Sequence, residues 1–199
     1  MAVSLSKGQT VSLTKGGGAS DPGLTKLHFG LGWDPVPKKK GFLGGLFGGG
    51  SEEIDLDASV IVFDDARQMI EMVWFRKLRS DDGAIQHTGD NLTGEGEGDD
   101  ESIKVDLGAL NPAASALVFL VNSFRGQTFD EVENAFCRVV DDSNDTEIAR
   151  FTLAEKGGHT GVILGIASKS GGTWSFKAVG EPSSSRSAPD MAAAAAKWL

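Results

Sequence analysis

Short apolar segments recur along the whole chain, and in each of them apolar residues either alternate with polar ones or run together. Clusters of Asp, Asn and Gly, such as those at 81–83 and 141–145, separate these segments. A period of two and short apolar runs bounded by turn residues are typical of β-strands. The strands that this pattern predicts lie at residues 3–5, 9–13, 24–33, 59–63, 70–74, 102–107, 117–124, 132–140, 147–153, 160–167 and 174–179.

This succession of short strands and turns favours an all-β fold, a β-sandwich of two sheets. The run at 118–121 is continuously apolar, which predicts a strand at the centre of a sheet. Residues 130–134 could instead begin a short helix before the next strand. With 199 residues the chain has the usual length of one domain and can bury about 70% of its unfolded surface.

The C-terminal segment has a different composition from the rest. We predict the sandwich domain at residues 1–180, followed at 181–199 by a Pro- and Ser-rich linker and a short C-terminal helix. Pro189 suits the first turn of this alanine-rich helix. A helix of this length is marginal alone, so its apolar residues must dock against the sandwich. The residues expected to dock are Met191, Trp198 and Leu199.

A Gly-rich insert loop occupies residues 34–53 and carries three consecutive lysines at 38–40. Four large apolar residues follow the lysines, namely Phe42, Leu43, Leu46 and Phe47. Basic and apolar residues together can contact a membrane surface or a partner. A flexible linker is the alternative interpretation, and we favour it because of the glycine content.

The acidic segment at 87–101 is the strongest indication of chemistry. It holds six carboxylates, one side-chain amide and two threonine hydroxyls, with no Lys or Arg among them. Ca²⁺ takes about 6–8 oxygen ligands of these types, so the segment predicts a calcium site. A solvated acidic loop is the alternative. The length of 90–101 matches an EF-hand loop, but Leu92, Gly94 and Glu95 do not suit its ligand and turn positions.

A second pair of carboxylates lies at the start of the segment 54–63. The period of two places Asp55, Asp57 and Ser59 on one face of a strand, with apolar residues on the other. Two carboxylates at such spacing can share a cation with a neighbouring loop, although a plain polar outer face gives the same pattern. Mg²⁺ suits a loop with many carboxylates less well, and transition metals would need more His or Cys.

The charge distribution supports a local cation site. The net charge is −9, and the segment 90–106, with seven acids and one lysine, contributes −6 of it, which leaves −3 for the rest. Acidity confined to one segment favours a cation site over general solubilising charge. Nucleic acid is excluded as a partner, because the sequence shows no basic patch that could follow phosphates.

Several segments carry a resemblance to a known family. They are residues 3–14, Gly30-Leu-Gly-Trp-Asp34, Asp55-Leu-Asp-Ala-Ser59, the acidic segment 87–101, residues 126–129 and residues 132–138. Together they resemble the TerD family of tellurite-resistance and general stress proteins. The resemblance implies a cytoplasmic, Ca²⁺-binding β-sandwich that acts in resistance to tellurite and other stress. It also implies association with other proteins of the tellurite-resistance system, including a membrane-embedded one.

The same resemblance suggests which residues bind the metal. The predicted ligands are Asp55, Asp57, Asp90, Asn91, Glu95, Glu97, Asp99, Asp100 and Glu101. We expect two Ca²⁺ ions, whose charge of +4 would suffice against a local −6. The ions would order the acidic loop against the Asp55/Asp57 strand end and so support binding of a partner or membrane complex.

An enzymatic function receives little support from the sequence. The three histidines, His28, His87 and His159, show no metal-ligand spacing, and neither a Gly-x-Ser-x-Gly elbow nor a phosphate loop is present. We therefore predict a protein that is not an enzyme. The alternatives are a metal-dependent hydrolase or phosphotransferase, and a Ca²⁺-dependent lectin-like or nucleotide-binding module.

The location and the single cysteine complete the expectations. The longest apolar run, at 116–121, is too short to span a membrane, and the first residues lack the apolar core of a signal peptide. Only Cys137 is present, so no intrachain disulfide can form, which favours the cytoplasm. We expect Cys137 to be a small buried hydrophobic residue, the alternative being a redox- or tellurite-reactive thiol.

Overall fold

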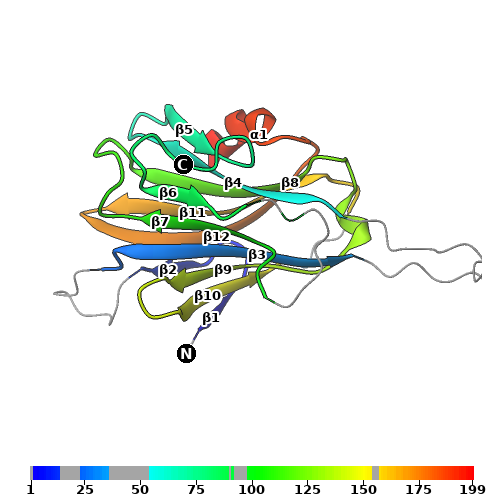
Figure 1. Ribbon diagram of the computed structural model, residues 1–199, viewed down its shortest axis with the longest axis horizontal. Coiled ribbons are helices and arrows are strands. Elements are labelled where there is room, and N and C mark those ends of the chain that lie inside the picture. Colours follow the sequence, from blue (N-terminus) through cyan, green and yellow to red (C-terminus); the bar gives the residue numbers. More distant parts are fainter. Residues whose placement is uncertain (1, 14–22, 36–53, 90, 92–97, 154–156) are drawn as a thin grey trace, which may run out of the picture.

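The structure, a computed structural model, describes residues 2–13, 23–35, 54–89, 91, 98–153 and 157–199. Two six-stranded sheets pack face to face (Figure 1). The first sheet has the order β1 (Val3–Leu5), β10 (Thr146–Thr152), β9 (Val132–Asp141), β3 (Lys26–Pro35), β7 (Glu101–Asp106), β6 (Ile85–His87). The second has the order β2 (Thr10–Ser12), β12 (Thr173–Ser183), β11 (Gly161–Ser170), β8 (Ala116–Ser123), β4 (Leu56–Phe63), β5 (Met69–Val73).

The sandwich core lies between the two sheets. Phe29 of β3 stacks on Phe119 of β8 with ring centroids 4.3 Å apart, and Phe176 of β12 lies 6.2 Å from both rings. Alternate residues of each inner strand point into this core, as the period-two pattern requires. The prediction of an all-β sandwich is therefore confirmed. The continuously apolar β8 lies between β11 and β4, as expected for a central strand.

Most predicted strands are present with shifted ends, and one strand was not predicted. β6 escaped prediction because its three residues are too few to show a period. β4 begins at Leu56, earlier than its apolar run suggests. Both interpretations of the segment around residue 130 hold in part, because a short 3₁₀ helix at Phe129–Glu131 leads directly into β9.

The C-terminal helix docks on the outer face of the second sheet. α1 (Ala188–Ala195) and a following 3₁₀ turn (Ala196–Trp198) lie there (Figure 1). Met191 is fully buried, and Trp198 and Leu199 pack against the same apolar cluster, so the predicted docking is confirmed. β12 continues to Ser183, so the predicted linker is wrong for its first three residues, which are strand.

Two predicted features fall outside the described residues. These are residues 36–53, which make up almost the whole insert loop, and positions 90 and 92–97 of the acidic segment. Within the described part of the chain, no helix is both long and apolar enough to cross a membrane.

Candidate functional site

The end of the acidic segment lies across β3, in a trough that two glycines create. A Cβ atom at Gly30 would collide with the Asp99 carboxylate, and one at Gly32 would lie 2.6 Å from the Gly98 carbonyl oxygen. The missing side chains therefore let Gly98 and Asp99 approach the outer face of the first sheet closely. This contact explains the Gly-x-Gly spacing in the segment 30–34.

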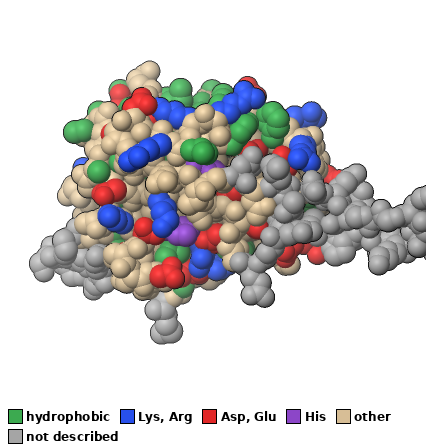
Figure 2. All heavy atoms as spheres, viewed as in Figure 1, with side chains coloured by type: hydrophobic (Ala, Val, Ile, Leu, Met, Phe, Trp, Pro, Cys, Tyr) green, Lys and Arg blue, Asp and Glu red, His purple; other side chains and the backbone are tan. Residues whose placement is uncertain are grey.

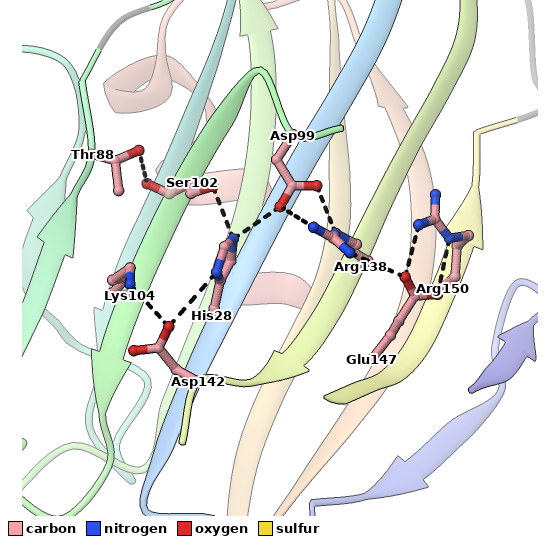
Figure 3. Close-up of polar contacts among 9 residues, drawn as sticks. All are labelled: His28, Thr88, Asp99, Ser102, Lys104, Arg138, Asp142, Glu147 and Arg150. Atoms are coloured by element: carbon pink, nitrogen blue, oxygen red, sulfur yellow. Dashed lines mark hydrogen bonds and ion pairs between the residues drawn. The ribbon is translucent and has the colours of Figure 1, made fainter. Parts of the chain in front are cut away.

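Two cationic or polar side chains hold Asp99 in this trough (Figure 3). Arg138 of β9 donates two hydrogen bonds to its carboxylate, from Nε at 2.7 Å and from a terminal nitrogen at 3.0 Å. His28 Nε2 lies 2.9 Å from Asp99 Oδ2, the oxygen that also accepts the 3.0 Å hydrogen bond from Arg138. Burial alone would raise the pKa of Asp99, but His28 and Arg138 hold it below its ordinary value. Asp99 is therefore an ionised anchor that ties the acidic segment to β3 and β9.

The anchor belongs to a chain of alternating charges on the outer face of the first sheet (Figure 3). Arg138 also contacts Glu147, which pairs with Arg150 at 2.7 Å. On the other side, Lys104 pairs with Asp142 at 3.0 Å. Figure 2 shows acidic, basic and histidine side chains interspersed on this face, without a large patch of one sign.

Ser102, His28 and Asp142 lie in an order that resembles a catalytic triad, but its chemistry is different. Ser102 Oγ and the Asp99 carboxylate both lie 2.9 Å from His28 Nε2. An ionised carboxylate can only accept, so His28 Nε2 must carry the hydrogen. That nitrogen cannot then remove a proton from Ser102, and the arrangement is an ion-pair network rather than a nucleophile and its base.

Asp100 points to the other side of the segment and receives backbone and side-chain donors. The Trp33 N–H donates to it at 2.9 Å, and Asn91 Nδ2 donates at 3.0 Å. Burial, with Asp34 and Asp99 close by, raises the pKa of Asp100. A carboxylate that is destabilised in this way gains from a nearby cation.

Glu101 and His87 connect the two sheets through one residue of β4. The Ala58 N–H donates to Glu101 Oε2 at 2.7 Å, and His87 Nε2 lies 3.1 Å from the Ala58 carbonyl oxygen. The Gly89 N–H donates to His87 Nδ1, so the hydrogen of the ring lies on Nε2 and points at that carbonyl. Burial raises the pKa of Glu101, although its partners oppose the shift. These two side chains occupy the edge of β4 beyond the end of β5.

The Asp55/Asp57 pair lies at the start of β4, on the outer face of the second sheet. Every residue of β4 is buried, because the C-terminal segment covers this face, so the alternative of a plain polar outer face does not hold. Asp57 is paired in register with Asn122 of β8, whose Nδ2 donates to the Arg186 carbonyl oxygen at 3.0 Å and lies 3.4 Å from Asp57. Asp55 forms an ion pair with Arg125 at 3.1 Å.

On this face, two buried oxygen atoms have no hydrogen-bond partner among the residues that the structure describes. They are Asn122 Oδ1 and Ser59 Oγ. Buried polar atoms are nearly always satisfied, so each such exception needs an explanation. Amide, hydroxyl and carboxylate oxygens are the donors that Ca²⁺ prefers, so this face suits that ion chemically.

The predicted ligands thus divide into groups. Asp99, Asp100 and Glu101 are held by protein donors, while Asp55 and Asp57 lie on the second sheet beside Asn122. Asn91 bridges to two of the first group, through its N–H to Glu101 and its amide to Asp100. The other predicted ligands, Asp90, Glu95 and Glu97, lie outside the described residues. Over the part of the chain that the structure describes, no three His, Cys, Asp or Glu side chains form a ready metal cluster.

Sequence analysis missed several residues of this region. Asn122 directly follows an apolar run, which is a weak signal for a buried amide. Arg138 and His28 gave no signal, because their role depends on the cross-strand neighbours of Gly30.

Cys137 is buried in the core, and burial raises the pKa of its thiol to about 12. The expectation of a small buried residue at this position is confirmed.

A comparison with known families decides the membership of the chain. The family model described as TerD domain matches residues 1–188. The chain belongs to the TerD family. Among its TerD relatives, tellurium resistance protein TerZ of Serratia marcescens is 54% identical over 189 residues, covering 95% of this chain and 94% of that protein. Stress response protein SCP2 of Bacillus subtilis (strain 168) is 45% identical over 188 residues, covering 91% and 92%.

A solved structure agrees with the TerD fold. It is a homologue of telluride resistance protein (TerD) from Streptomyces coelicolor A3(2), with a TM-score of 0.68 and 22% identity over 85% of this chain and 96% of that one. At this identity the likeness shows the sandwich fold alone. The resemblance found in the sequence is confirmed, and the protein is a member of the TerD family of tellurium-resistance and stress-response proteins.

Proposed function

We propose that this TerD-family protein is a non-enzymatic stress protein that binds Ca²⁺ where the acidic segment meets the start of β4. The observation that carries the proposal is a pair of buried oxygens, Asn122 Oδ1 and Ser59 Oγ, on the same face as Asp57, for which the described part of the chain supplies no hydrogen-bond partner. A cation would supply the positive partner that these oxygens lack. The local charge of −6 supports the same conclusion.

The described contacts suggest which predicted ligands would bind the ion and which would position the acidic segment. Asp55, Asp57 and Asn122 would hold the ion from the second sheet, and the acids of the segment 90–97 would complete its shell. Asp99 and Glu101 would serve as the frame, because both are already bound by protein donors. Asp100 suits either role, because it accepts hydrogen bonds from protein donors and its raised pKa means that its ionised form would gain from a cation. Two ions, as expected from the sequence, fit a segment with this many acids.

Membership of the family supports a proposal for the cellular role. The names of the relatives refer to tellurium resistance and to stress response. We infer that the Ca²⁺-ordered acidic segment supports binding to other proteins of the tellurite-resistance system, including a membrane-embedded one, and that the protein acts in the cytoplasm. The commitment of His28 Nε2 to Asp99 supports a role without catalysis.

A thermal melt of chelator-stripped protein tests the metal site directly. Titration with Ca²⁺ should raise the melting temperature strongly, and Mg²⁺ should raise it little. Binding to the folded state alone adds about 2.7 kcal/mol at a hundredfold excess over the dissociation constant. The absence of any shift with either ion would contradict the proposal.

Ligand variants sharpen this test in a calorimetric titration. Asp57→Asn should weaken Ca²⁺ binding at least tenfold, because a carboxylate ligand is lost. Asp65→Asn is the matched control, since Asp65 lies in the exposed turn after β4, at the far end of that strand from Asp57. Equal affinities for the two variants would remove Asp57 from the ligand set.

A further inference from the structure

Three aromatic rings meet at a corner of the second sheet, where β5 and β8 end. After β5 the chain reverses in a two-residue loop: the backbones of Trp74 and Lys77 exchange hydrogen bonds at 3.1 and 2.8 Å, which leaves Phe75 and Arg76 at the tip. Phe124 directly follows β8 and is 47% exposed. The ring centroids lie 4.9 Å apart for Trp74 and Phe75 and 5.5 Å apart for Phe75 and Phe124, both in edge-to-face contacts. The rings therefore form one continuous group.

The guanidinium of Arg76 lies over all three rings. It is 5.5 Å from the centroid of the Trp74 ring, 5.3 Å from that of Phe75 and 6.0 Å from that of Phe124. A cation is attracted to the face of an aromatic ring within about 6 Å of its centroid. Trp74 in turn packs against the apolar cluster that contains α1. The rings thus hold the guanidinium in place before a partner arrives, which reduces the entropy lost on binding.

The guanidinium of Arg76 still has donors to offer. Arg76 is exposed, and no carboxylate among the described residues forms an ion pair with it. Its neighbour Lys77 differs, since it pairs with Glu71 at 2.9 Å and with Asp81 at 2.7 Å. A guanidinium presents its N–H groups in a planar fork that matches the two oxygens of a carboxylate. A carboxylate from another molecule would therefore meet a donor fork that is already positioned.

We propose that Trp74, Phe75, Arg76 and Phe124, which together make up the aromatic–arginine surface, form a docking surface for a partner protein that presents a carboxylate beside an apolar side chain. Arg76 binds the carboxylate through two hydrogen bonds, and the rings pack against the apolar side chain. Aromatic and arginine side chains are the types that dominate binding energy at protein interfaces. The inference goes beyond the proposed function, because none of these four residues is a predicted Ca²⁺ ligand.

The charges around the aromatic–arginine surface favour a protein partner over a membrane or a nucleic acid. Anionic membranes and nucleic acids are bound by several cations acting together. Here Glu71 and Asp81 already neutralise Lys77. Asp81, with 85% of its side chain exposed, would also repel an extended negative surface. A single carboxylate with an apolar neighbour needs only the fork of Arg76 and the rings beside it.

A titration followed by nuclear magnetic resonance tests this surface. The probe is a blocked peptide of sequence Leu-Glu-Leu, and the matched probe is Leu-Gln-Leu, which has nearly the same shape without the charge. The Glu peptide should shift the Trp74 indole, the Phe75 amide and the Arg76 Nε–H resonances in one saturable process. It should bind at least about fivefold more tightly than the Gln peptide, as a bidentate charged pair predicts. Equal affinities, or no shift of these resonances, would overturn the inference.

Two arginine variants test the role of the donor fork. Arg76→Lys keeps the positive charge and removes the fork, and Arg67→Lys is the control, because Arg67 is an exposed arginine between β4 and β5. Arg76→Lys should bind the Glu peptide at least about fivefold more weakly than the wild type, with little change for the Gln peptide. Arg67→Lys should bind both peptides as the wild type does. Equal affinities of the two variants for the Glu peptide would show that Arg76 does not bind the carboxylate.

A third variant tests the rings. Phe124→Leu removes one ring from the group and keeps an apolar side chain. It should weaken binding of the Glu peptide by about twofold or more, because the guanidinium is held less firmly. The melting temperature should stay close to that of the wild type, because Phe124 is half exposed. An unchanged affinity would overturn the assignment of Phe124 to the surface.

Other occupants give different results. Retention on vesicles of equal parts of phosphatidylcholine and phosphatidylglycerol should be the same for the wild type and Arg76→Ala, and spectra without peptide should not change with protein concentration. Retention that Arg76→Ala abolishes would assign the surface to a membrane, and concentration-dependent shifts at Phe75 and Arg76 would assign it to a second copy of the chain. Either result would overturn the proposed partner. All titrations are made in chelator, so that a failure here and a failure of the proposed Ca²⁺ site are separate results.

Discussion

At the scale of single residues, the Asp82 carboxylate accepts hydrogen bonds from an unusual number of donors for a residue in an exposed turn. Asp82 lies in an exposed turn, yet it accepts hydrogen bonds from Ser80 Oγ at 2.6 Å, the Ala84 N–H at 2.8 Å and the Asn111 N–H at 2.7 Å. Partial burial would raise the pKa of Asp82, but these donors outweigh it and hold the pKa below its ordinary value. The ionised form thus joins two loops at the end of the first sheet.

This contact predicts a pH dependence for Asp82→Asn. A lowered pKa in the folded state stabilises the protein above the unfolded pKa, which is about 3.9, and that stability is lost as the pH falls through the folded value. The variant should be less stable by about 0.5–1.5 kcal/mol near neutral pH. The difference in melting temperature should shrink as the pH falls below about 4.

The control for this pH series is Asp65→Asn, in the exposed turn after β4. Its melting temperature should stay close to that of the wild type throughout. A difference for Asp82→Asn that grows as the pH falls would contradict the assignment of Asp82 as an ionised acceptor.

At the scale of elements, the C-terminal helix α1 buries Ala188, Met191 and Ala195, and Met191 is the largest of these side chains. Met191 is fully buried between α1 and the second sheet, and its Sδ would lie 3.1 Å from a Cβ at Gly161. Met191→Ala should therefore lower the free energy of unfolding by about 2–5 kcal/mol. Denaturant titration measures it, with Met69→Ala as control, because Met69 is 53% exposed and should change stability by less than about 0.5 kcal/mol. Equal losses would mean that α1 does not stabilise the sandwich.

The same elements show how far the sequence could predict this structure. Period-two patterns and turn residues were sufficient for most strands, because a buried strand face imposes its pattern locally. They missed β6, which is only three residues long and gains its place by pairing with β7. They also ended β12 too early, because Pro182 suggested a linker, although it lies in strand pairing opposite Val162.

The candidate site was predictable in composition and not in geometry. A run of acids can be recognised without knowledge of the fold, so the acidic segment was evident from the sequence. The contacts of Asp99 with Arg138, and of Glu101 with Ala58, join residues 39 and 43 positions apart and depend on how the strands are ordered. No local pattern carries that information. The assignment of nine ligands thus stays a prediction.

At the scale of the whole molecule, the single cysteine reports on global opening. Cys137 lies in β9, between β3 and β10, and its thiol is buried with a pKa of about 12. A thiol reagent should therefore label it only as fast as the sandwich unfolds, because the thiolate is the reactive form. Labelling followed against denaturant concentration should match the unfolding transition. Rapid labelling of the native protein would instead support a reactive thiol.

The side chains that bind Ala58 have a consequence for association between molecules. Where β5 ends, the edge of β4 would offer unpaired backbone groups, and such edges recruit strands from other chains into aggregates. His87 and Glu101 already occupy both backbone groups of Ala58 at this edge, and both side chains are buried, so an incoming strand would have to displace them. The pair therefore protects this edge of β4 against pairing with a strand from another molecule.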